Sequence, residues 1–452
     1  MPRDNALKKN KKSKRIKPDL PGGFRDYGPA DAIARQGMLD TIRRTFESFG
    51  FDPLETSAVQ KTEVLTGGEE DSGKIIFNVR GSQEEADAPA GASAKDGTSL
   101  RFDLTVPLAR FVAANQEIPK PFKRYQIGTV WRGERQQAGR YREFTQADVD
   151  IVGSSSLDAD AEMVAIIYTT FKNLGVEKFI IKYNNRKILN ALPAYAGFAD
   201  EKLWDALRII DKRDKIGDGG VKKELIKEFD ANVADKIAEF VASKGVGQEG
   251  SEEYEKIRAM LADLAPGMED YFIADFSLVR GLSYYTGSVF EVILPDAPEI
   301  GSVCGGGRYD NLVAQFTGQK IPAVGVSIGV DRLFAAMEKL RMIKKKQTLT
   351  QVLILQLDES MKNEYRVIAQ ELRNVGINAA LYLGDDPMLQ AQLVYAVKKE
   401  IPYVIIYGAN EKAKGVVAIK NLATREQKEI PREQVVPYLA GLMGPPRVCQ
   451  CG

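Results

Sequence analysis

The sequence predicts an α+β domain built on antiparallel strands and interrupted by a helical insertion, followed by a separate α/β domain. Three observations support this fold class. Two strand-like runs, FKRYQIGTVWRGE and the stretch from Arg140 to Ile151, are joined by RQQAG, whose length and glycine favour a hairpin loop. Residues 193–264 are rich in Lys, Glu, Asp, Ala and Leu and have helical periodicity. From residue 349 strand and helix patterns alternate, as in a separate α/β domain of about 95 residues.

The first hundred residues combine a basic arm, a helix and a short strand. Residues 1–18 are basic and almost without apolar side chains, which predicts a disordered arm that serves either as a solubilising tail or as a weak RNA contact. A helix follows the turn-rich LPGGFRDYGP, because apolar residues from Ile33 to Phe46 recur at helical spacing and Gly50 can end it. FDPLETSAV then predicts a short strand, and residues 82–98 predict a loop.

The middle of the chain predicts further strands around the insertion. In an extended SLRFDLT, the side chains of Arg101, Asp103 and Thr105 share one face. A helix is expected over residues 157–174, a strand over KFIIKYNN, and a strand pair over FSLVRGLSYYTGSVFEVIL. Three consecutive glycines, Gly305–Gly307, suit the close approach of a ligand or of another backbone. IPAVGVSIGVDRLFAAMEKL predicts an apolar strand and then a helix.

The C-terminal pattern and the charges before it define the expected boundaries. Strands are expected at LTQVLILQLD, INAALYLG, PYVIIYG and VVAIKNL, with helices near 360–375, 386–400 and 432–443. The expected segments are a disordered basic arm at 1–18, a large α+β domain at 19–338 that contains the helical insertion at 193–264, a charged linker at 339–348, an α/β domain at 349–441 and a flexible tail at 442–452.

Composition excludes several classes of protein. The chain has 452 residues and a net charge of +1, so charge alone does not indicate a nucleic-acid partner. No run approaches the roughly 18 apolar residues of a membrane span, and the N-terminus lacks the apolar core of a secretory signal. Three cysteines, two of them in a C-x-C tail, do not make a disulfide framework and do not favour a zinc site. We therefore expect a protein of the reducing cytoplasm, with no membrane partner.

The chain contains no histidine. Ser-His-Asp hydrolases, His-ligated zinc enzymes and phosphohistidine chemistry are thereby excluded, because each needs an imidazole from the protein. Any reaction that the chain catalyses must proceed without an imidazole base or nucleophile of its own.

The strand-like stretch after the hairpin loop presents an unusual polar face. With period two, one face carries two arginines, an aromatic ring, an amide and two carboxylates, and the other face is mostly apolar. The residues of the polar face are Arg140, Arg142, Phe144, Gln146, Asp148 and Asp150. The simplest alternative is an exposed hairpin with a solvated face, but that alternative must also explain a phenylalanine in the middle of the row.

The remaining polar groups suggest electrostatic chemistry on phosphates. Arginines stand beside glycines or at predicted element ends at positions 132, 140, 280, 308 and 332. Arginine grips phosphate through paired N–H groups, and carboxylates with arginine partners suit Mg²⁺ held through phosphates. Neither a P-loop nor a Rossmann glycine motif occurs in the sequence, so a nucleotide would have to bind on an antiparallel sheet. Together these features favour phosphoryl or nucleotidyl chemistry.

Several motifs resemble those of one known family. LPGGFRDYGP, LRFDLTVPLAR, RYQIGTVWRGERQQAGRYREFTQADVDIVG, VRGLSYYTGSVFEV, CGGGRYDNL and PAVGVSIGVDRL resemble, in the same order, the motifs of histidyl-tRNA synthetases. IIDKRDKIGDGGVKKEL resembles the insertion domain of that family, and QLVYAVKKEIPYVIIYGANEKAKGVVAIKNL resembles its anticodon-binding domain. The sequence departs from the family pattern at Ser283, where RGLDYY has Asp, and at Ser57, where the first class II motif has Pro.

The resemblance implies a fold and a reaction. It implies a class II synthetase catalytic domain with an antiparallel sheet, and a three-layer α/β anticodon-binding domain, in a homodimer. It implies that histidine and ATP, with Mg²⁺, give histidyl-adenylate, and that the histidyl group then passes to the 3′ end of histidine tRNA. The attacking group is the carboxylate of the substrate, so the absence of a histidine base in the protein is consistent with this reaction.

The resemblance also implies roles for individual residues. The implied catalytic residues are Arg132, on the α-phosphate, and Arg280, on the pentavalent transition state. The implied ATP-binding residues are Arg132, Glu134, Arg140, Phe144 against adenine, and Arg332 near the γ-phosphate. The implied histidine-binding residues are Asp103 and Thr105 at the amino group, and Gln146, Asp150, Tyr284, Tyr285 and Tyr309 around the carboxylate and imidazole. Arg142 and Asp148 are expected to have supporting roles. Mg²⁺ would be held through the ATP phosphates, with Glu134 as a candidate ligand and no other direct protein ligand.

Three alternatives remain at this point. A histidine-binding regulatory paralogue of a phosphoribosyltransferase would lack the anticodon-binding domain, and a tRNA-sensing module of a kinase would have degraded motifs. A synthetase for another amino acid would lack RGLxYYTG. A further hypothesis concerns the missing histidines: a synthetase without histidine could be translated while charged histidine tRNA is scarce.

Overall fold

The computed structural model describes residues 16–67, 76–80, 97–133, 139–242, 249–279 and 284–443. The described residues group into two compact units. The first unit consists of the described residues up to Asp26 together with Thr41–Met342. The second unit consists of Tyr27–Asp40 together with the described residues from Ile343 onward. None of the helices in the described part of the chain has the length and the apolar character that a membrane crossing requires.

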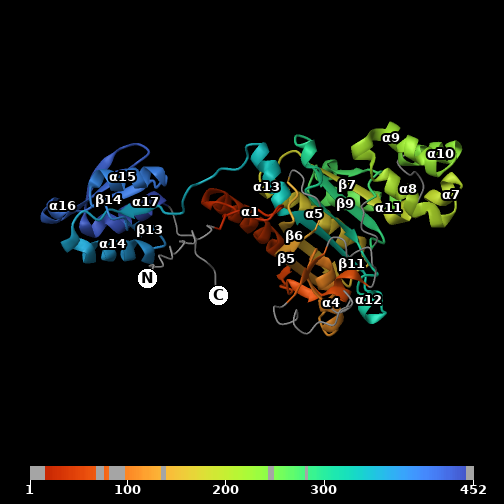
Figure 1. Ribbon diagram of the computed structural model, residues 1–452, viewed down its shortest axis with the longest axis horizontal. Helices are drawn as coiled ribbons and strands as arrows, with labels where there is room; N and C mark the ends of the chain where they lie inside the picture. Colours follow the sequence, from red (N-terminus) through yellow and green to blue (C-terminus); the bar gives the residue numbers. More distant parts are fainter. Residues whose placement is uncertain are drawn as a thin grey trace, which may run out of the picture. The chain divides into compact units, whose positions relative to one another are not determined.

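An eight-stranded sheet forms the centre of the first unit (Figure 1). Its strand order is β1-β5-β6-β11-β10-β9-β7-β8, in which the outer pairs β1–β5 and β7–β8 are parallel and the pairs between them are antiparallel. The predicted antiparallel sheet is thus confirmed. The strands are β1 (Asp52–Pro53), β5 (Phe122–Trp131), β6 (Glu143–Val152), β7 (Ile180–Asn185), β8 (Phe272–Ala274), β9 (Ser288–Ile293), β10 (Cys304–Arg308) and β11 (Ala323–Gly329).

Helices and a second, small sheet complete the body of the first unit. The helix α5 begins after Ser156, whose hydroxyl accepts a hydrogen bond from the backbone N–H of Asp158 as an N-cap, and it buries an apolar face that includes Phe171. The helices are α1 (Pro29–Ser48), of which the last residues belong to this unit, α2 (Thr62–Thr66), α4 (Thr105–Ala114), α5 (Leu157–Asn173), α12 (Ala314–Thr317) and α13 (Val330–Lys339). The small sheet has the order β2-β4-β3 and consists of β2 (Val59–Lys61), β4 (Thr98–Leu100) and β3 (Phe77–Val79).

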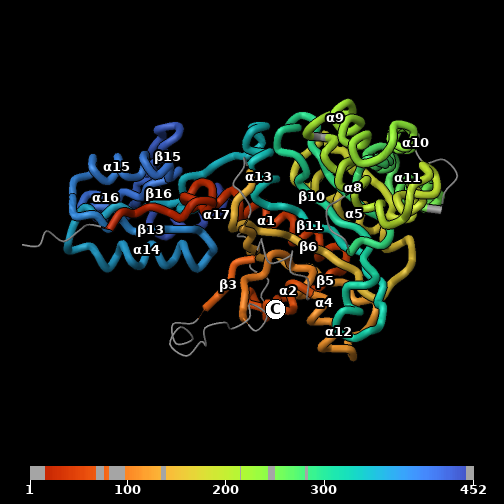
Figure 2. The backbone as a smooth tube through the Cα atoms, turned by 45° about the vertical axis from the view of Figure 1, so that its right-hand side comes forward, coloured from red at the N-terminus to blue at the C-terminus, as the bar shows by residue number. Residues whose placement is uncertain are grey.

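A group of helices lies between β7 and β8 in the sequence, as predicted. These helices gather at one side of the first unit (Figure 2), around a core that includes Leu207, Ile237 and Phe240. They are α6 (Arg186–Asn190), α7 (Leu192–Ala196), α8 (Leu203–Ile210), α9 (Arg213–Glu228), α10 (Ala231–Ala242) and α11 (Glu249–Leu264). Because β7 and β8 are neighbours in the eight-stranded sheet, these helices form an insertion between two adjacent strands of that sheet.

Two predicted strands were wrong in extent. SLRFDLT does not stay extended to Thr105, because β4 ends at Leu100 and α4 begins at Thr105. The carboxylate of Asp103 accepts a hydrogen bond of 3.1 Å from the backbone N–H of Val106, which stabilises the start of this helix. In the predicted strand pair of residues 276–294, the described residues form one strand, β9, and Ser283 lies outside the described residues.

The second unit is a three-layer α/β fold, as predicted. Its sheet has the order β13-β12-β14-β15-β16. Alternate residues of β12 face opposite layers: Val352 and Ile354 pack with α14 and α17, whereas Leu353 packs with Ala396 of α15. The predicted strands and helices are present, and the sequence missed α16 and β16. The elements are β12 (Val352–Ile354), α14 (Lys362–Asn374), β13 (Ala379–Leu381), α15 (Leu389–Lys398), β14 (Tyr403–Ile406), α16 (Ala409–Ala413), β15 (Val416–Asn421), β16 (Gln427–Pro431) and α17 (Val435–Met443).

Candidate active site

A cavity of about 290 Å³ lies in the first unit, with walls from β6, β10, β11, the segment before α4, and α13. The described residues to which the resemblance gives a catalytic or binding role all line this cavity: Asp103, Thr105, Arg132, Arg140, Phe144, Gln146, Asp150, Tyr284, Tyr285, Tyr309 and Arg332. Glu134 and Arg280 lie outside the described residues. The structure therefore brings together residues that are far apart in the sequence, whereas their individual roles remain predictions.

The polar row of β6 forms the floor of the cavity. Phe144, Gln146, Asp148 and Asp150 all line it, and the last three are only 8%, 2% and 3% exposed. Since β6 lies between β5 and β11 and these side chains are buried, the alternative of a solvated hairpin face is wrong. Arg142 does not line the cavity: the strand begins at Glu143, and the stem of Arg142 packs against Gly23 instead.

Asp150 is held by two partners at one end of this floor. Its Oδ1 atom accepts a hydrogen bond of 2.5 Å from the hydroxyl of Tyr309, and its Oδ2 atom lies 2.7 Å from Nη2 of the fully buried Arg124. Burial raises the pKa of Asp150, while the charge of Arg124 and the Tyr309 hydrogen bond act in the opposite direction. Gly325 makes room for this carboxylate, because a Cβ atom there would lie 1.8 Å from Asp150 Oδ1.

Sequence reasoning missed Arg124. It lies on β5 directly across from Asp150 in the antiparallel register. The Nη2 atom of Arg124 donates a hydrogen bond to the backbone carbonyl of Leu104 at 3.3 Å. Its contact with Asp150 Oδ2 is an ion pair that lacks the geometry of a hydrogen bond. The sequence did contain a signal for this ion pair. Arg124 lies in a strand-like run, and the register of the predicted hairpin places it opposite the carboxylate of Asp150.

Four buried acceptor atoms of the cavity residues have no hydrogen-bond partner among the described residues. They are Asp103 Oδ2, Gln146 Oε1, Asp148 Oδ1 and Asp150 Oδ2, of which the last has the ion pair with Arg124. Burial raises the pKa of Asp103 to about 6 and that of Asp148 to about 7, although Arg132 and Arg124 oppose these respective shifts. Buried acceptors without donors are costly. This end of the cavity therefore fits a ligand that brings several N–H groups.

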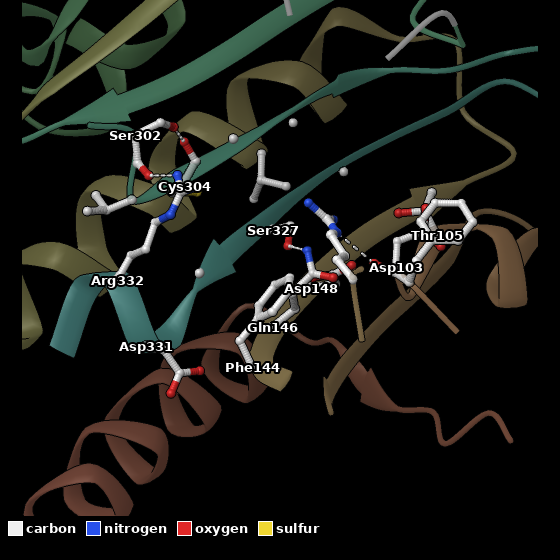
Figure 3. Close-up of a pocket in the computed structure, with 18 of the residues that line it drawn as sticks. Asp103, Thr105, Phe144, Gln146, Asp148, Ser302, Cys304, Ser327, Asp331 and Arg332 are labelled. Atoms are coloured by element: carbon white, nitrogen blue, oxygen red, sulfur yellow. Dashed lines mark hydrogen bonds between the residues drawn. The ribbon is translucent and has the colours of Figure 1, made fainter. Parts of the chain in front are cut away.

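Arginines and an aromatic ring form the other part of the cavity. The guanidinium of Arg132 lies 5.2 Å from the centre of the Phe144 ring, and its Nε atom donates to the carbonyl of Phe102 at 2.9 Å. The Nη1 atom of Arg332 donates to the carbonyl of Ser302, also at 2.9 Å. In Figure 3, Arg332 lies on one side of the cavity and Asp103 on the other. Anionic groups of a ligand are therefore favoured toward the arginines, and cationic groups toward the carboxylates.

Three tyrosines enclose the end of the cavity near Asp150. The rings of Tyr284 and Tyr285 are 4.9 Å apart, and those of Tyr284 and Tyr309 are 6.0 Å apart. Burial raises the pKa of Tyr284 and Tyr309 well above the ordinary value, so their hydroxyls stay protonated and available as donors.

One arginine of the predicted phosphate-binding set has a structural role instead. Arg308 does not line the cavity; it forms a buried ion pair with Asp160 of α5 and donates to the carbonyls of Ser154 and Ser156. Of the three glycines before it, Gly306 permits a close approach of backbone, because a Cβ atom there would lie 2.1 Å from the carbonyl oxygen of Gly325 on β11. Arg308 and Gly306 thus hold strands and helices together beneath the site.

Among the described residues, no group of three or more cysteines and carboxylates could hold a metal ion. The described carboxylates of the cavity are Asp103, Asp148, Asp150 and Asp331. Each lies near an arginine or accepts a hydrogen bond. A metal that enters with a phosphate ligand would thus depend on that ligand for most of its oxygen atoms.

Comparison with known proteins decides the family. The family model for "Histidyl-tRNA synthetase" matches residues 23–333. The chain belongs to the histidyl-tRNA synthetase family. A second family model, "Anticodon binding domain", matches residues 351–442. The histidyl-tRNA synthetase fold therefore accounts for the cavity in the first unit, and the anticodon-binding fold for the three-layer second unit.

Relatives and solved structures agree with this assignment. A histidine–tRNA ligase of Clostridium tetani is 40% identical over 447 residues, which cover 93% of this chain and 98% of the relative. One of Wolinella succinogenes is 40% identical and covers 91% of this chain and 96% of its own. The crystal structure of histidyl-tRNA synthetase from Nostoc sp. PCC 7120 matches with a TM-score of 0.82 and 31% identity, over 95% of this chain and all of that chain.

Proposed function

We propose that this chain is a histidine–tRNA ligase. It joins histidine to the AMP part of ATP to give histidyl-adenylate and pyrophosphate. It then transfers the histidyl group to the 3′ end of histidine tRNA. The observation that carries the proposal is the division of charge within one cavity. Free buried acceptors, among them Asp103, lie at one end, and Arg332 lies at the other (Figure 3). Histidine brings N–H donors to the first end and ATP brings phosphates and adenine to the second.

The end with Asp150 is suited to the imidazole ring. An imidazole presents two nitrogens, of which the neutral ring has one donor and one acceptor. Asp150 accepts from the donor nitrogen, while Tyr309 and Arg124 hold the carboxylate in place. Because the Tyr309 hydroxyl already donates to Asp150, the hydroxyl that meets the second nitrogen comes from Tyr284 or Tyr285. Asp103 and Thr105, at the start of α4, receive the α-ammonium group.

Adenylation proceeds by electrostatic stabilisation. An oxygen of the histidine carboxylate forms a bond to the α-phosphorus of ATP, and the bond from that phosphorus to the pyrophosphate oxygen breaks. Negative charge grows on the α-phosphate, and Arg132 counters it without reorganisation. Phe144 stacks on adenine, and Arg140 and Arg332 hold the phosphates. Arg280 keeps its proposed role on the transition state by family resemblance alone.

The proposal also covers the metal ion, the oligomeric state, the cellular location and the domain boundaries. Mg²⁺ enters with ATP and is bound through the phosphates, with Glu134 as a candidate protein ligand. The family supports a homodimer in the cytoplasm, and residues 349–441 support anticodon binding. The boundaries 19–338, 339–348 and 349–441 are part of the same proposal. The presence of an anticodon-binding fold favours a tRNA ligase over a regulatory histidine-binding paralogue.

Charging of tRNA tests the proposal. Purified full-length protein, ATP, Mg²⁺ and total bacterial tRNA are incubated with each radiolabelled amino acid in turn, and labelled tRNA is precipitated. We expect label with histidine alone. The variant Asp150→Asn should lose most of this activity, because a carboxamide presents a donor as well as an acceptor to the ring and loses the charge that pairs with Arg124. Charging with a different amino acid, or with none, would refute the proposed function.

A further inference from the structure

Asp331, the second residue of α13, joins that helix to β6. Its Oδ2 atom accepts a hydrogen bond of 2.6 Å from the backbone N–H of Thr145. The side chain lines the cavity, and the residue is only 4% exposed. The reaction proposed above uses the next residue, Arg332, but gives this buried carboxylate no part.

The carboxylate stands where the sheet runs out of strand. The register of β6 and β11 pairs Gln146 with Gly329, the last residue of β11, so the next residue opposite Thr145 would be Val330. Val330 is already the first residue of α13, and a helical backbone carbonyl is directed along the helix axis. An oxygen atom of the Asp331 side chain therefore accepts the hydrogen bond that a strand carbonyl would otherwise take.

The two cavity residues beside Thr145 differ in what else holds them. Gln146 pairs with Gly329 on β11, and its Nε2 atom donates to Oγ of Ser327 at 2.6 Å. Phe144 lies past the end of β11 and pairs with Val130 on the other neighbour, β5. Loss of the Thr145 hydrogen bond should therefore displace Phe144 more than Gln146.

The same hydrogen bond also fixes the start of α13, which carries Arg332. The Nη1 atom of Arg332 donates to the carbonyl of Ser302 at 2.9 Å, and its backbone follows that of Asp331 directly. Figure 3 shows Asp331 and Arg332 at the start of one helix and Phe144 on the neighbouring strand. A single hydrogen bond thus joins the residue next to Phe144 to the residue next to Arg332.

We propose that Asp331 is a positioning residue for ATP, which sets the spacing between Phe144 and Arg332 by accepting the backbone N–H of Thr145. The inference rests on the proposed function, in which the ring meets adenine and the guanidinium meets the phosphates. What this role requires is an acceptor atom at the right place, and an asparagine carbonyl can supply it. A role for the charge alone, such as stabilising the N-terminal turn of α13, would instead require the carboxylate.

Asp331→Ala is the first test, because it removes the acceptor and leaves the N–H of Thr145 buried. We expect the KM for ATP in ATP–pyrophosphate exchange to rise about tenfold, the scale of losing one hydrogen bond to a charged group. The KM for histidine should change by less than about threefold, because Gln146 keeps its contacts with β11. Loss of stability alone would lower the amount of active enzyme, and with it the apparent kcat, without moving either KM.

Two further variants separate the acceptor from the charge. Asp331→Asn keeps an oxygen in place without the charge, so its KM for ATP should return to within about threefold of the wild type. Asp331→Glu keeps the charge but is longer by one methylene, so its KM for ATP should rise as in Asp331→Ala, and it serves as the test if the alanine variant does not fold. Glu338→Gln changes the other carboxylate of α13 and is the matched control.

Calorimetry of ATP binding to the same proteins distinguishes failure of this inference from failure of the proposed function. A wild type that binds ATP without histidine-dependent exchange would overturn the function alone, and the Kd for ATP should still rise about tenfold in Asp331→Ala. An unchanged KM and Kd for ATP in the folded alanine and glutamate variants would overturn the inference alone. So would an asparagine variant as weak as the alanine variant, because the charge would then matter, or an equal rise in the KM for histidine.

Discussion

Replacement of the buried Asp148 by asparagine should stabilise the first unit at neutral and alkaline pH. Asp148 is 2% exposed, and burial raises its pKa from an ordinary 3.8 to about 7, against the opposing charge of Arg124. Between these two pH values the unfolded chain releases the proton and the folded chain keeps it. The folded state then binds more protons, so the contribution of this group to stability is complete below about pH 4 and is lost as the pH rises toward 7.

The size of the effect follows from the shift. A difference of roughly three pKa units corresponds to about 4 kcal/mol, at 1.36 kcal/mol per unit. Asparagine keeps the shape but never ionises. The free energy of unfolding of Asp148→Asn should therefore exceed that of the wild type by up to about 4 kcal/mol at pH 8, and the two should converge near pH 4.

Tryptophan fluorescence can measure this in the first unit. The chain has two tryptophans, Trp131 on β5 and Trp204 on α8, so a Trp204→Phe background isolates a reporter in the eight-stranded sheet. Urea unfolding is followed at pH 4.5, 6 and 8. Asp263→Asn, at an exposed position of α11, is the matched control and should track the background at every pH.

Equal unfolding free energies of Asp148→Asn and its background at pH 8 would refute the reasoning, as would a lower value for the variant. A variant that is more stable at pH 8 and yet binds histidine more weakly would mean that Asp148 is present for function at the expense of stability.

Four other predictions follow from the same structure and sequence. Tyr309→Phe removes the hydroxyl that donates to Asp150; the KM for histidine should rise about 10- to 100-fold with the KM for ATP unchanged, as measured by pyrophosphate exchange. Arg280→Ala should lower the single-turnover rate of adenylation by about 10²- to 10³-fold, the scale of one transition-state donor, with histidine binding nearly intact by calorimetry. Arg308→Met leaves the carboxylate of Asp160 buried without its partner, so the free energy of unfolding should fall by about 3–5 kcal/mol while the KM values of the folded enzyme stay unchanged. Restoring several histidines at exposed positions should lower the amount of protein made during histidine starvation but not in rich medium, as quantitative immunoblotting would measure. If the variant and the histidine-free chain were made in equal amounts during starvation, that would count against a role for the histidine-free sequence.

The fold could be predicted where the sequence pattern is strong and local. Helical spacing predicted α1, α5 and the helices of the insertion, and the alternation of strand and helix patterns predicted the strands of the second unit other than β16. The errors arose where one side chain overrides the pattern. SLRFDLT looks extended throughout, but a helix starts at Thr105, and the hydrogen bond from the Val106 N–H to Asp103 stabilises its first turn.

The cavity could be predicted only in part. Period two and family resemblance identified the floor residues Phe144, Gln146 and Asp150. Arg124 and Ser327 belong to the strands on either side, and their positions depend on the registers β5–β6 and β6–β11, which the sequence does not specify for the second pair. Arg308 was misassigned because an arginine beside glycines has the same sequence pattern whether it meets a phosphate or a buried carboxylate.

Histidine-dependent ATP–pyrophosphate exchange tests the central claim most directly. The proposed pairing of both imidazole nitrogens, at an Asp150 held by Tyr309 and Arg124, should make the enzyme discriminate steeply against amino acids with apolar rings. We predict exchange with histidine and a kcat/KM for phenylalanine lower by about 10⁴-fold or more, because phenylalanine would leave the buried polar groups unpaired. Exchange that is independent of histidine, or that proceeds comparably with phenylalanine, would contradict the account.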